Sequence, residues 1–253
     1  MSHSCVNILL GGDHRSEAVT PTLINSINLN TNRDVHVVVL CRGWKRESFH
    51  SGKLRVDFVE YSGEINTPSS HQSSANDKLL YLEHLPEWDR CLILGWDQLV
   101  VGCLDDLYDL EFAEHQVITG VPYPSGKMRD LWTWKGKQGD LEAMFPDSIL
   151  DSPGFDGGTH LVALDHYRQQ GLASRLRHIL EKLGGEDHLA MIGLFADKLL
   201  PIEAKWNVLC GKMHKISAKI LHFNGGNKPW KPNNKKPVWE MFRCDWDFLQ
   251  RSE

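Results

Sequence analysis

Short apolar runs that alternate with polar and helical stretches constrain the fold of this chain more than any other feature. The runs lie at residues 6–10, 35–40, 54–61 and 91–94. Each has the length of a buried strand, and residues 16–30 have the mixed spacing of a helix. Strands that alternate with helices favour right-handed βαβ units. The pattern therefore predicts an α/β domain built on a mostly parallel sheet.

Two glycines and an aspartate, Gly11, Gly12 and Asp13, follow the first of these strands. Open α/β sheets bind ligands at the carboxyl ends of their strands, and a nucleotide is the usual occupant. A plain turn with Asp13 capping the next helix would use the same residues. Both interpretations stay open at the level of the residue pattern.

A carboxylate interrupts the fourth apolar run. Asp97 lies between residues 91–94 and the apolar residues 99–101. A buried carboxylate without a partner is costly. We therefore expect Asp97 to point into a cleft or to bind a cation.

Residues 222–230, which read HFNGGNKPW, combine several groups that suit a phosphate ligand. His222 suits a divalent ion. Gly225 and Gly226 let backbone N–H groups approach a phosphate closely, and Lys228 adds a positive charge. The stretch predicts a grip on a metal-bound diphosphate. The alternative is a glycine-rich turn after a strand at residues 216–221, with His222 at the edge of the core.

Composition excludes some classes of function. The chain has 253 residues and a net charge of −5, which argues against a nucleic-acid binder. Its six cysteines are scattered without a C-x-x-C pair, as in a protein of a reducing compartment. No signal sequence or long apolar run is apparent, so we expect a cytoplasmic protein. We expect one domain over residues 1–230 and a tail, residues 231–253, packed on it.

The string at residues 222–230 resembles the H-x-x-G-x-x-K-P-W signature of glycosyltransferase family 8. The resemblance implies a GT-A type α/β fold, a Rossmann-like mixed sheet flanked by helices. It also implies a retaining transferase that moves a hexose from a UDP-sugar to a hydroxyl of an unknown glycan, lipid or small-molecule acceptor.

The family's metal-binding D-x-D segment resembles residues 95–97, but the first aspartate is replaced by Gly95. In the family, both aspartates and the later histidine help to hold Mn²⁺. The resemblance thus implies that Asp97 and His222 bind Mn²⁺ or Mg²⁺, more weakly than with two carboxylates. Metal-independent catalysis and lost activity are the alternatives.

Three more segments carry the resemblance. Residues 155–158 resemble the family's F-N-(A/S)-G, which implies that Asp156 and Gly157 contact the donor sugar. Asp187 and His188 resemble a D-Q pair near the reactive anomeric carbon, with histidine replacing glutamine. Trp206 and Asn207 resemble an aromatic-Asn pair that precedes the last strand.

The nucleotide contacts follow from the same matching. Asp13, beside Gly11 and Gly12, would touch the uridine, and Lys78 falls where the family has an arginine near the phosphates. Gly225, Gly226 and Lys228 would stabilise the departing UDP.

The favoured mechanism is attack of the acceptor hydroxyl on the face that UDP leaves. A double displacement would need a carboxylate close to the sugar, and Asp187 and Asp156 are the candidates. The rival function is a non-catalytic or metal-independent sugar-nucleotide binder, since Gly95, Asp156 and His188 depart from the family pattern.

The remaining segments give weaker predictions. Residues 69–76 resemble a loop, and residues 77–85 and 165–183 resemble helices. The irregular span 123–153 is a candidate acceptor wall. The basic aromatic tail could lie on an anionic membrane surface, which for a cytoplasmic protein is the inner face, or could pack back on the domain.

Overall fold

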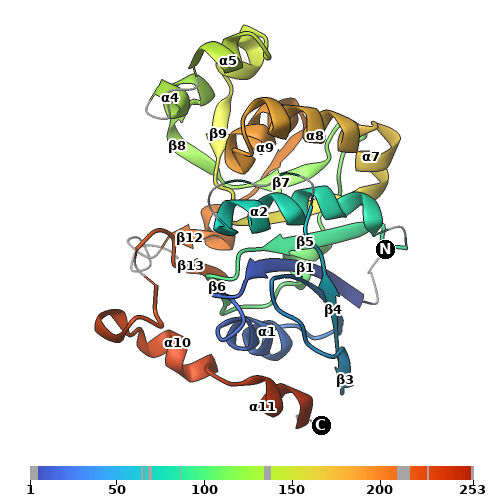
Figure 1. Ribbon diagram of the computed structural model, residues 1–253, viewed down its shortest axis with the longest axis vertical. Coiled ribbons are helices and arrows are strands. Elements are labelled where there is room, and N and C mark those ends of the chain that lie inside the picture. The colour runs from blue at the N-terminus through green and yellow to red at the C-terminus, as the bar shows by residue number, and fades with distance from the viewer. Residues whose placement is uncertain are drawn as a thin grey trace.

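The computed structural model describes residues 5–63, 65, 67, 70–85, 87–133, 138–209, 217–226 and 228–251. Its largest element is a mixed sheet with the strand order β11-β7-β10-β5-β1-β2-β4-β3 (Figure 1). The strands of this sheet are β1 (Cys5–Asp13), β2 (Asp34–Arg42), β3 (Phe49–Ser51), β4 (Leu54–Glu60), β5 (Arg90–Leu94), β7 (Ile118–Gly120), β10 (Thr159–Ala163) and β11 (Leu199–Pro201).

The centre of the sheet is parallel, as the alternating sequence pattern predicts, because β1 pairs with both β2 and β5 in parallel and β2 pairs with β4. The prediction of a mostly parallel sheet does not extend to its outer strands. β10 runs antiparallel to β5 and β7, and β3 runs antiparallel to β4. The sheet is therefore mixed, and β10 starts at the same edge at which β1 and β5 end.

Two small sheets complete the strand structure. β6 (Gln98–Val100) and β12 (Val208–Leu209) flank β13 (Ile220–His222), with β13 antiparallel to β6. β8 (Pro122–Lys127) pairs with β9 (Pro153–Phe155). The first of these sheets places His222 opposite Gln98, and so close to the end of β5.

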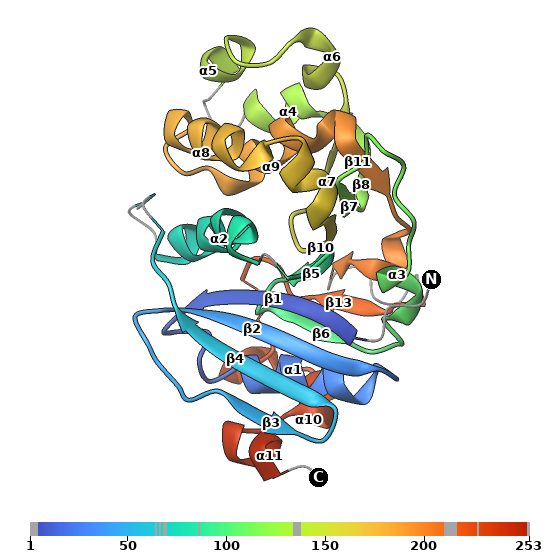
Figure 2. The same cartoon turned by 90° about the vertical axis from the view of Figure 1, so that its right-hand side faces the viewer.

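Helices cover both faces of the main sheet (Figure 2). They are α1 (Thr20–Leu29), α2 (Ser70–Tyr81), α3 (Asp105–Tyr108), α4 (Met128–Thr133), α5 (Gln138–Glu142), α6 (Asp147–Leu150), α7 (Leu164–Gln169), α8 (Leu172–Lys182), α9 (Asp187–Phe195), α10 (Pro237–Phe242) and α11 (Trp246–Arg251). Short 3-10 turns lie at Leu82–His84, Ala196–Lys198, Ala204–Trp206 and Pro232–Asn234.

The core divides into two layers because successive side chains of a strand point to opposite faces. Leu9 and Val38 pack with residues of α2, α8 and α9. Their neighbours Ile8 and Val37 pack with residues of α1 on the other face. All four side chains are buried.

Three element boundaries differ from the sequence prediction. β1 continues through Asp13, so the turn begins after the glycine pair. The helix expected from residue 77 already starts at Ser70. The helix expected over residues 165–183 is two helices, because Gly171 adopts a left-handed φ of 60° and ends the first.

The C-terminal residues pack on the domain beside α1 (Figure 1). Trp239 and Trp246 are buried, and the indole N–H of Trp246 donates to the carbonyl of Glu17. Met241 and Phe248 remain exposed. Among the described residues, no helix has the length and apolar character needed to cross a membrane.

Candidate active site

Three adjoining pockets lie where β1 and β5 end and β10 begins. The inner pocket, of about 130 Å³, is lined by Gly11, Lys78, Asp97, Asp187 and others. The tyrosine pocket, of about 270 Å³, includes Tyr123, Leu131, Asp156 and His188. The tryptophan pocket, of about 700 Å³, includes Arg15, Trp96, Lys228 and Trp230. His222 lines all three pockets.

The aspartate and the histidine singled out in the sequence lie together. Asp97 follows β5, and His222 ends β13, which pairs with β6 immediately after Asp97. Their Oδ2 and Nε2 atoms are 3.6 Å apart. The backbone joins them as well, since the N–H of Phe223 donates to the carbonyl of Asp97 at 2.9 Å. Residues 125 positions apart are thus held by sheet pairing rather than by side-chain contact alone.

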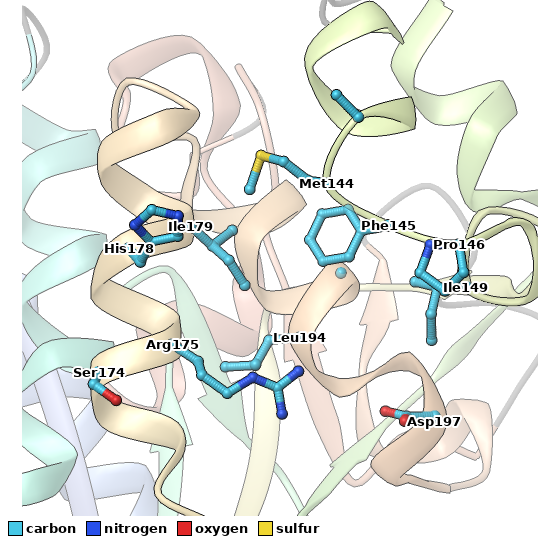
Figure 3. A pocket seen from close by; sticks show the side chains of 12 residues that line it. Met144, Phe145, Pro146, Ile149, Ser174, Arg175, His178, Ile179, Leu194 and Asp197 are labelled. Atoms are coloured by element: carbon cyan, nitrogen blue, oxygen red, sulfur yellow. The ribbon is translucent and has the colours of Figure 1, made fainter.

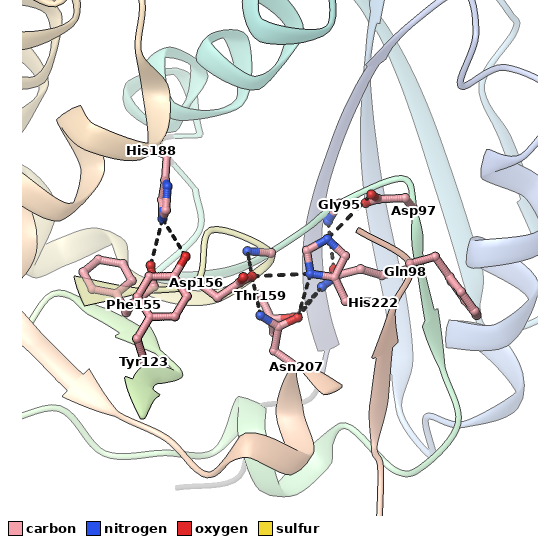
Figure 4. Close-up of polar contacts among 12 residues, drawn as sticks. Gly95, Asp97, Gln98, Tyr123, Phe155, Asp156, Thr159, His188, Asn207 and His222 are labelled. Carbon is pink, nitrogen blue, oxygen red and sulfur yellow. Dashed lines mark hydrogen bonds and ion pairs between the residues drawn. The ribbon is translucent and has the colours of Figure 1, made fainter. Parts of the chain in front are cut away.

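Asn207 fixes the orientation of the His222 ring (Figure 4). His222 Nδ1 lies 3.0 Å from Asn207 Oδ1, an oxygen that can only accept. Nδ1 therefore carries a hydrogen, and Nε2 is the nitrogen directed toward Asp97. Gln98 Nε2 donates to the same Asn207 oxygen at 3.2 Å and to Thr159 Oγ1 at 2.8 Å, which holds the amide in place.

Charge is balanced around the histidine. Asp156 Oδ1 lies 3.3 Å from His222 Nδ1, on the side away from Asp97. Burial alone would lower the pKa of His222, but the interactions with Asp156 and Asp97 outweigh it and raise the pKa to about 9. Burial alone would raise the pKa of Asp97, but His222 and Lys228 hold it well below its usual range. The imidazolium therefore lies between two ionised carboxylates.

The donor atoms present fit a divalent cation with two protein ligands. Two atoms 3.6 Å apart can both reach an ion at about 2.1 Å from each. The Asn207 contact leaves Nε2 as the nitrogen that could bind an ion, and a bound ion would displace the Nε2 proton of the imidazolium. A hydrogen-bonded Nδ1 is the outer-shell arrangement usual for metal-binding histidines. Within the described residues, no group of three or more His, Cys, Asp or Glu side chains could hold a metal ion.

Gly95 is adapted to the present position of Asp97. A Cβ atom at residue 95 would come within 2.7 Å of Asp97 Oδ1. The N–H of Gly95 donates to Gln98 Oε1 at 2.9 Å. An aspartate at position 95 would therefore require Asp97 to move.

Lys228 reaches the same aspartate. Its Nζ forms an ion pair with Asp97 Oδ2 and donates to the carbonyl of Phe223 at 2.8 Å. Gly225 has a left-handed φ of 62°, which a glycine adopts without strain, and both Gly225 and Gly226 are exposed. Lys228 and Gly225 line the tryptophan pocket beside Asp97.

At the end of β1, Asp13 was expected to contact the nucleotide, but its carboxylate is bound to Arg15 instead. Gly11 approaches Lys78 so closely that a Cβ would lie 2.6 Å from Lys78 Cγ. Asp13 is buried, and its two oxygens accept hydrogen bonds from the Arg15 guanidinium at 2.5–3.1 Å. Arg15, rather than Asp13, lines the tryptophan pocket. Burial lowers the pKa of Lys78, whose Nζ donates to the carbonyl of Leu94.

Asp156 is held through one oxygen. Its Oδ1 accepts from Asn207 Nδ2 at 2.5 Å and from the N–H of Gly158 at 2.9 Å. Gly157 and Gly158 form the wall shared by the inner and tyrosine pockets. A Cβ at Gly158 would lie 2.6 Å from His222 Nδ1, so this position requires glycine.

Asp187 and His188 lie in the first turn of α9 and line different pockets, the inner and the tyrosine pocket respectively. His188 Nε2 donates to the carbonyl of Phe155 at 2.9 Å and lies 3.3 Å from the hydroxyl of Tyr123. The tip of the histidine is thus bound to β9 (Figure 4).

The sequence model described as "Glycosyl transferase family 8" matches residues 8–234. The chain belongs to glycosyltransferase family 8. General stress protein A of Bacillus subtilis (strain 168) is 20% identical over 252 residues, a match that covers 85% of this chain and 83% of that protein.

Solved glycosyltransferases have a similar fold. The galactosyltransferase LgtC, in complex with donor and acceptor sugar analogues, has a TM-score of 0.70 at 16% identity, over 94% of each chain. The bifunctional glycosyltransferase WbbM has a TM-score of 0.72 at 17% identity, over 94% of this chain and 49% of that one. This chain therefore spans about half of WbbM. The expected GT-A type fold is confirmed by these likenesses and by the mixed sheet.

A fourth cavity, of about 600 Å³, lies apart from the three adjoining pockets (Figure 3). Phe145 and Ile149 line it on one side, and Arg175 and His178 of α8 line it on the other (Figure 3). It shares no residue with the three adjoining pockets. Of the irregular span 123–153, only Tyr123 and Leu131 line the adjoining pockets among the described residues.

Sequence reasoning missed three residues of the site. Gln98 carried a detectable signal, because a polar residue within the apolar run 91–101 needs a buried partner. Trp96 and Arg15 carried none, since a tryptophan or an arginine at a strand end fits a surface as well as a pocket. Their roles depend on which residues the fold brings beside them.

Proposed function

We propose that this family 8 glycosyltransferase is a retaining hexosyltransferase that uses a UDP-sugar and a divalent cation. The observation that carries the proposal is the convergence of Asp97, His222 and Lys228 at one point. Asp97 lies 3.6 Å from the histidine and is ion-paired with the lysine. Two metal-ligand types and a phosphate-binding cation at one point suit a metal-bound diphosphate.

The diphosphate would lie between the inner and tryptophan pockets. Lys228 would exchange its contact with Asp97 for the phosphate oxygens, and the backbone at Gly225 and Gly226 would donate to the same group. Asp97 and His222 would hold Mn²⁺ or Mg²⁺, which when bound neutralises negative charge on the leaving diphosphate. Lys78 is a second lysine at the site and lines the inner pocket.

The hexose would lie toward the carboxylates of the inner and tyrosine pockets. Asp187 lines the inner pocket and Asp156 the tyrosine pocket, and carboxylate oxygens accept hydrogen bonds from sugar hydroxyls. The acceptor would enter through the tyrosine pocket, between Tyr123 and Leu131.

Transfer would proceed on the face that UDP leaves. The acceptor oxygen bonds to the anomeric carbon while the bond from that carbon to the diphosphate breaks, and the diphosphate keeps the electron pair. A departing phosphate oxygen takes the hydroxyl proton, so no protein base is required. Asp156 suits a positioning role because its Oδ1 is already held by two N–H donors and by His222.

The test is UDP release from UDP-glucose and UDP-galactose, with and without Mn²⁺, in the wild type and in Asp97→Ala, His222→Ala and Lys228→Ala. We expect Mn²⁺ to stimulate release in the wild type and each variant to lose about a hundredfold or more. Asp197→Ala and His178→Ala are matched controls, because these residues line the separate cavity, and they should keep wild-type rates. Undiminished release in Asp97→Ala and His222→Ala would refute the proposal.

A non-catalytic sugar-nucleotide binder is the second candidate. Two observations favour it: Gly95 removes one carboxylate ligand, and His188 is bound to the Phe155 carbonyl instead of being directed at a substrate. This candidate predicts tight UDP binding without release of UDP from either sugar nucleotide.

Peripheral membrane contact through residues 231–253 stays a prediction.

A further inference from the structure

Four aromatic rings form a column from the core to the tryptophan pocket. Phe223 and Trp239 are buried and meet edge to face, with centroids 5.7 Å apart. Trp239 contacts Trp230 at 5.3 Å, and Trp230 contacts Trp96 at 5.1 Å with an interplanar angle of 35°. Because the inner two rings are fixed in the core, the outer two are held in place at the pocket wall.

Trp96 occupies the junction between pockets. It lies in the turn from β5 to β6 and lines both the inner and the tryptophan pocket, while Trp230 lines the tryptophan pocket only. Lys228 Nζ lies 5.5 Å from the centroid of Trp96 and 5.9 Å from that of Trp230. The lysine proposed to hold the diphosphate is therefore adjacent to both indole rings.

The pockets differ in the chemistry that they offer. The tryptophan pocket has three cations, Arg15, Lys228 and Lys231, and its one carboxylate, Asp97, is paired with Lys228. It suits a flat anionic ligand. The carboxylates suited to sugar hydroxyls, Asp187 and Asp156, line the other two pockets.

These differences orient a nucleotide sugar. With the diphosphate at Lys228, the sugar extends toward Asp187 and Asp156, and the nucleoside extends in the opposite direction, into the tryptophan pocket. The volume of about 700 Å³ is ample for a nucleoside. Trp96 and Trp230 are the aromatic side chains that line this pocket within the described part of the chain.

We infer that Trp96 is the stacking platform for the base of the bound nucleotide and sets a large share of its affinity. The inference rests on the proposed function, because it assumes a nucleoside diphosphate in this pocket. A base stacked on an aromatic side chain changes affinity about tenfold when the aromatic ring is removed. Arg15, held by Asp13, lines the same pocket.

The test compares UDP with inorganic pyrophosphate, which has the phosphates but no base. Calorimetric affinities are measured for both ligands in the wild type, Trp96→Leu and Trp96→Phe. We expect Trp96→Leu to weaken UDP binding about tenfold and Trp96→Phe less than threefold, since phenylalanine keeps an aromatic face. Pyrophosphate affinity should be the same in all three proteins.

Two results would overturn the inference: unchanged UDP affinity in Trp96→Leu, or an equal loss of UDP and pyrophosphate affinity. Thermal unfolding checks that the variants are folded. If Trp96→Leu does not fold, the quenching of tryptophan fluorescence by UDP is compared between the wild type and Trp96→Phe. The quenching should be smaller in Trp96→Phe, because the tryptophan that stacks on the base is absent. Absence of UDP binding to the wild type would count against the proposed function instead.

Discussion

Asp156 is the residue of the site whose charge and hydrogen bonds can be examined separately. Its Oδ1 accepts from Asn207 and from the backbone of Gly158, and it lies beside the ring of His222. An asparagine at this position would keep that acceptor and remove the charge. The negative charge at position 156 and the amide-like hydrogen bonding can therefore be separated by substitution.

We expect Asp156→Asn to keep transferase turnover within about tenfold of the wild type, because the acceptor oxygen remains. Asp156→Ala should lose more turnover and lower the free energy of unfolding by about 1–3 kcal/mol, since the buried Asn207 amide loses its partner. UDP release and denaturant unfolding measure the two effects. Equal loss of turnover in both variants would show that the charge takes part in the reaction, as in a double displacement.

The sequence indicated those site residues whose local pattern needs a partner or matches a family signature. Asp97, His222 and Lys228 could be predicted because each stands in a local pattern that is costly without a partner or that matches a family signature. The pairing of Asp13 with Arg15 could not, because an exposed arginine has many alternative partners. The structure thus places Arg15 at the pocket where the sequence placed Asp13.

At the level of elements, β10 connects the site to the core. It begins beside the Gly157–Gly158 wall, and its His160 is buried between β7 and the ring of Phe155. Burial lowers the pKa of His160 to about 4, although the hydrogen bond to the carbonyl of Thr119 favours the proton. The folded protein therefore keeps this histidine neutral below the pH at which it would be protonated in the unfolded chain.

The sign of the pH effect follows. Between the unfolded pKa of about 6.5 and the folded value of about 4, the unfolded state binds the extra proton. Stability should therefore be fully present above pH 6.5 and fall by roughly 3 kcal/mol as the pH falls to 4. Denaturant unfolding across this range measures it.

His160→Asn is the matched control, because its amide N–H can still donate to Thr119 and does not titrate. We expect the variant to have a flatter dependence of unfolding free energy on pH over the same window. The same slope in both proteins would mean that other groups cause the acid loss.

Element boundaries were less predictable than element types. The periodicity of residues 165–183 is continuous, so it gave one helix, while the left-handed φ of Gly171 divides it into two. Residues 69–76 are small and polar and resemble a loop, yet Ser73, Ser74 and Asn76 are buried within α2. Tertiary packing overrides weak helix propensity there.

At the scale of the whole molecule, the residues of the candidate site lie at one edge of the sheet, where β1 and β5 end and β10 begins. The parallel centre could be predicted from the sequence because its strands are local apolar runs. The antiparallel β10 could not, because its direction depends on the long connection through β8, α4–α6 and β9. This connection and α9 bring Tyr123, Leu131 and His188 to the tyrosine pocket.

The central claim is that Asp97 and His222 join a divalent cation to the diphosphate of a bound nucleotide. Calorimetric titration of UDP with and without Mn²⁺, in the wild type and in His222→Ala, tests it most directly. Because binding coupling is reciprocal, we expect Mn²⁺ to strengthen UDP binding at least tenfold in the wild type and to leave it unchanged in His222→Ala. Equal UDP affinity with and without Mn²⁺ in the wild type would contradict the claim.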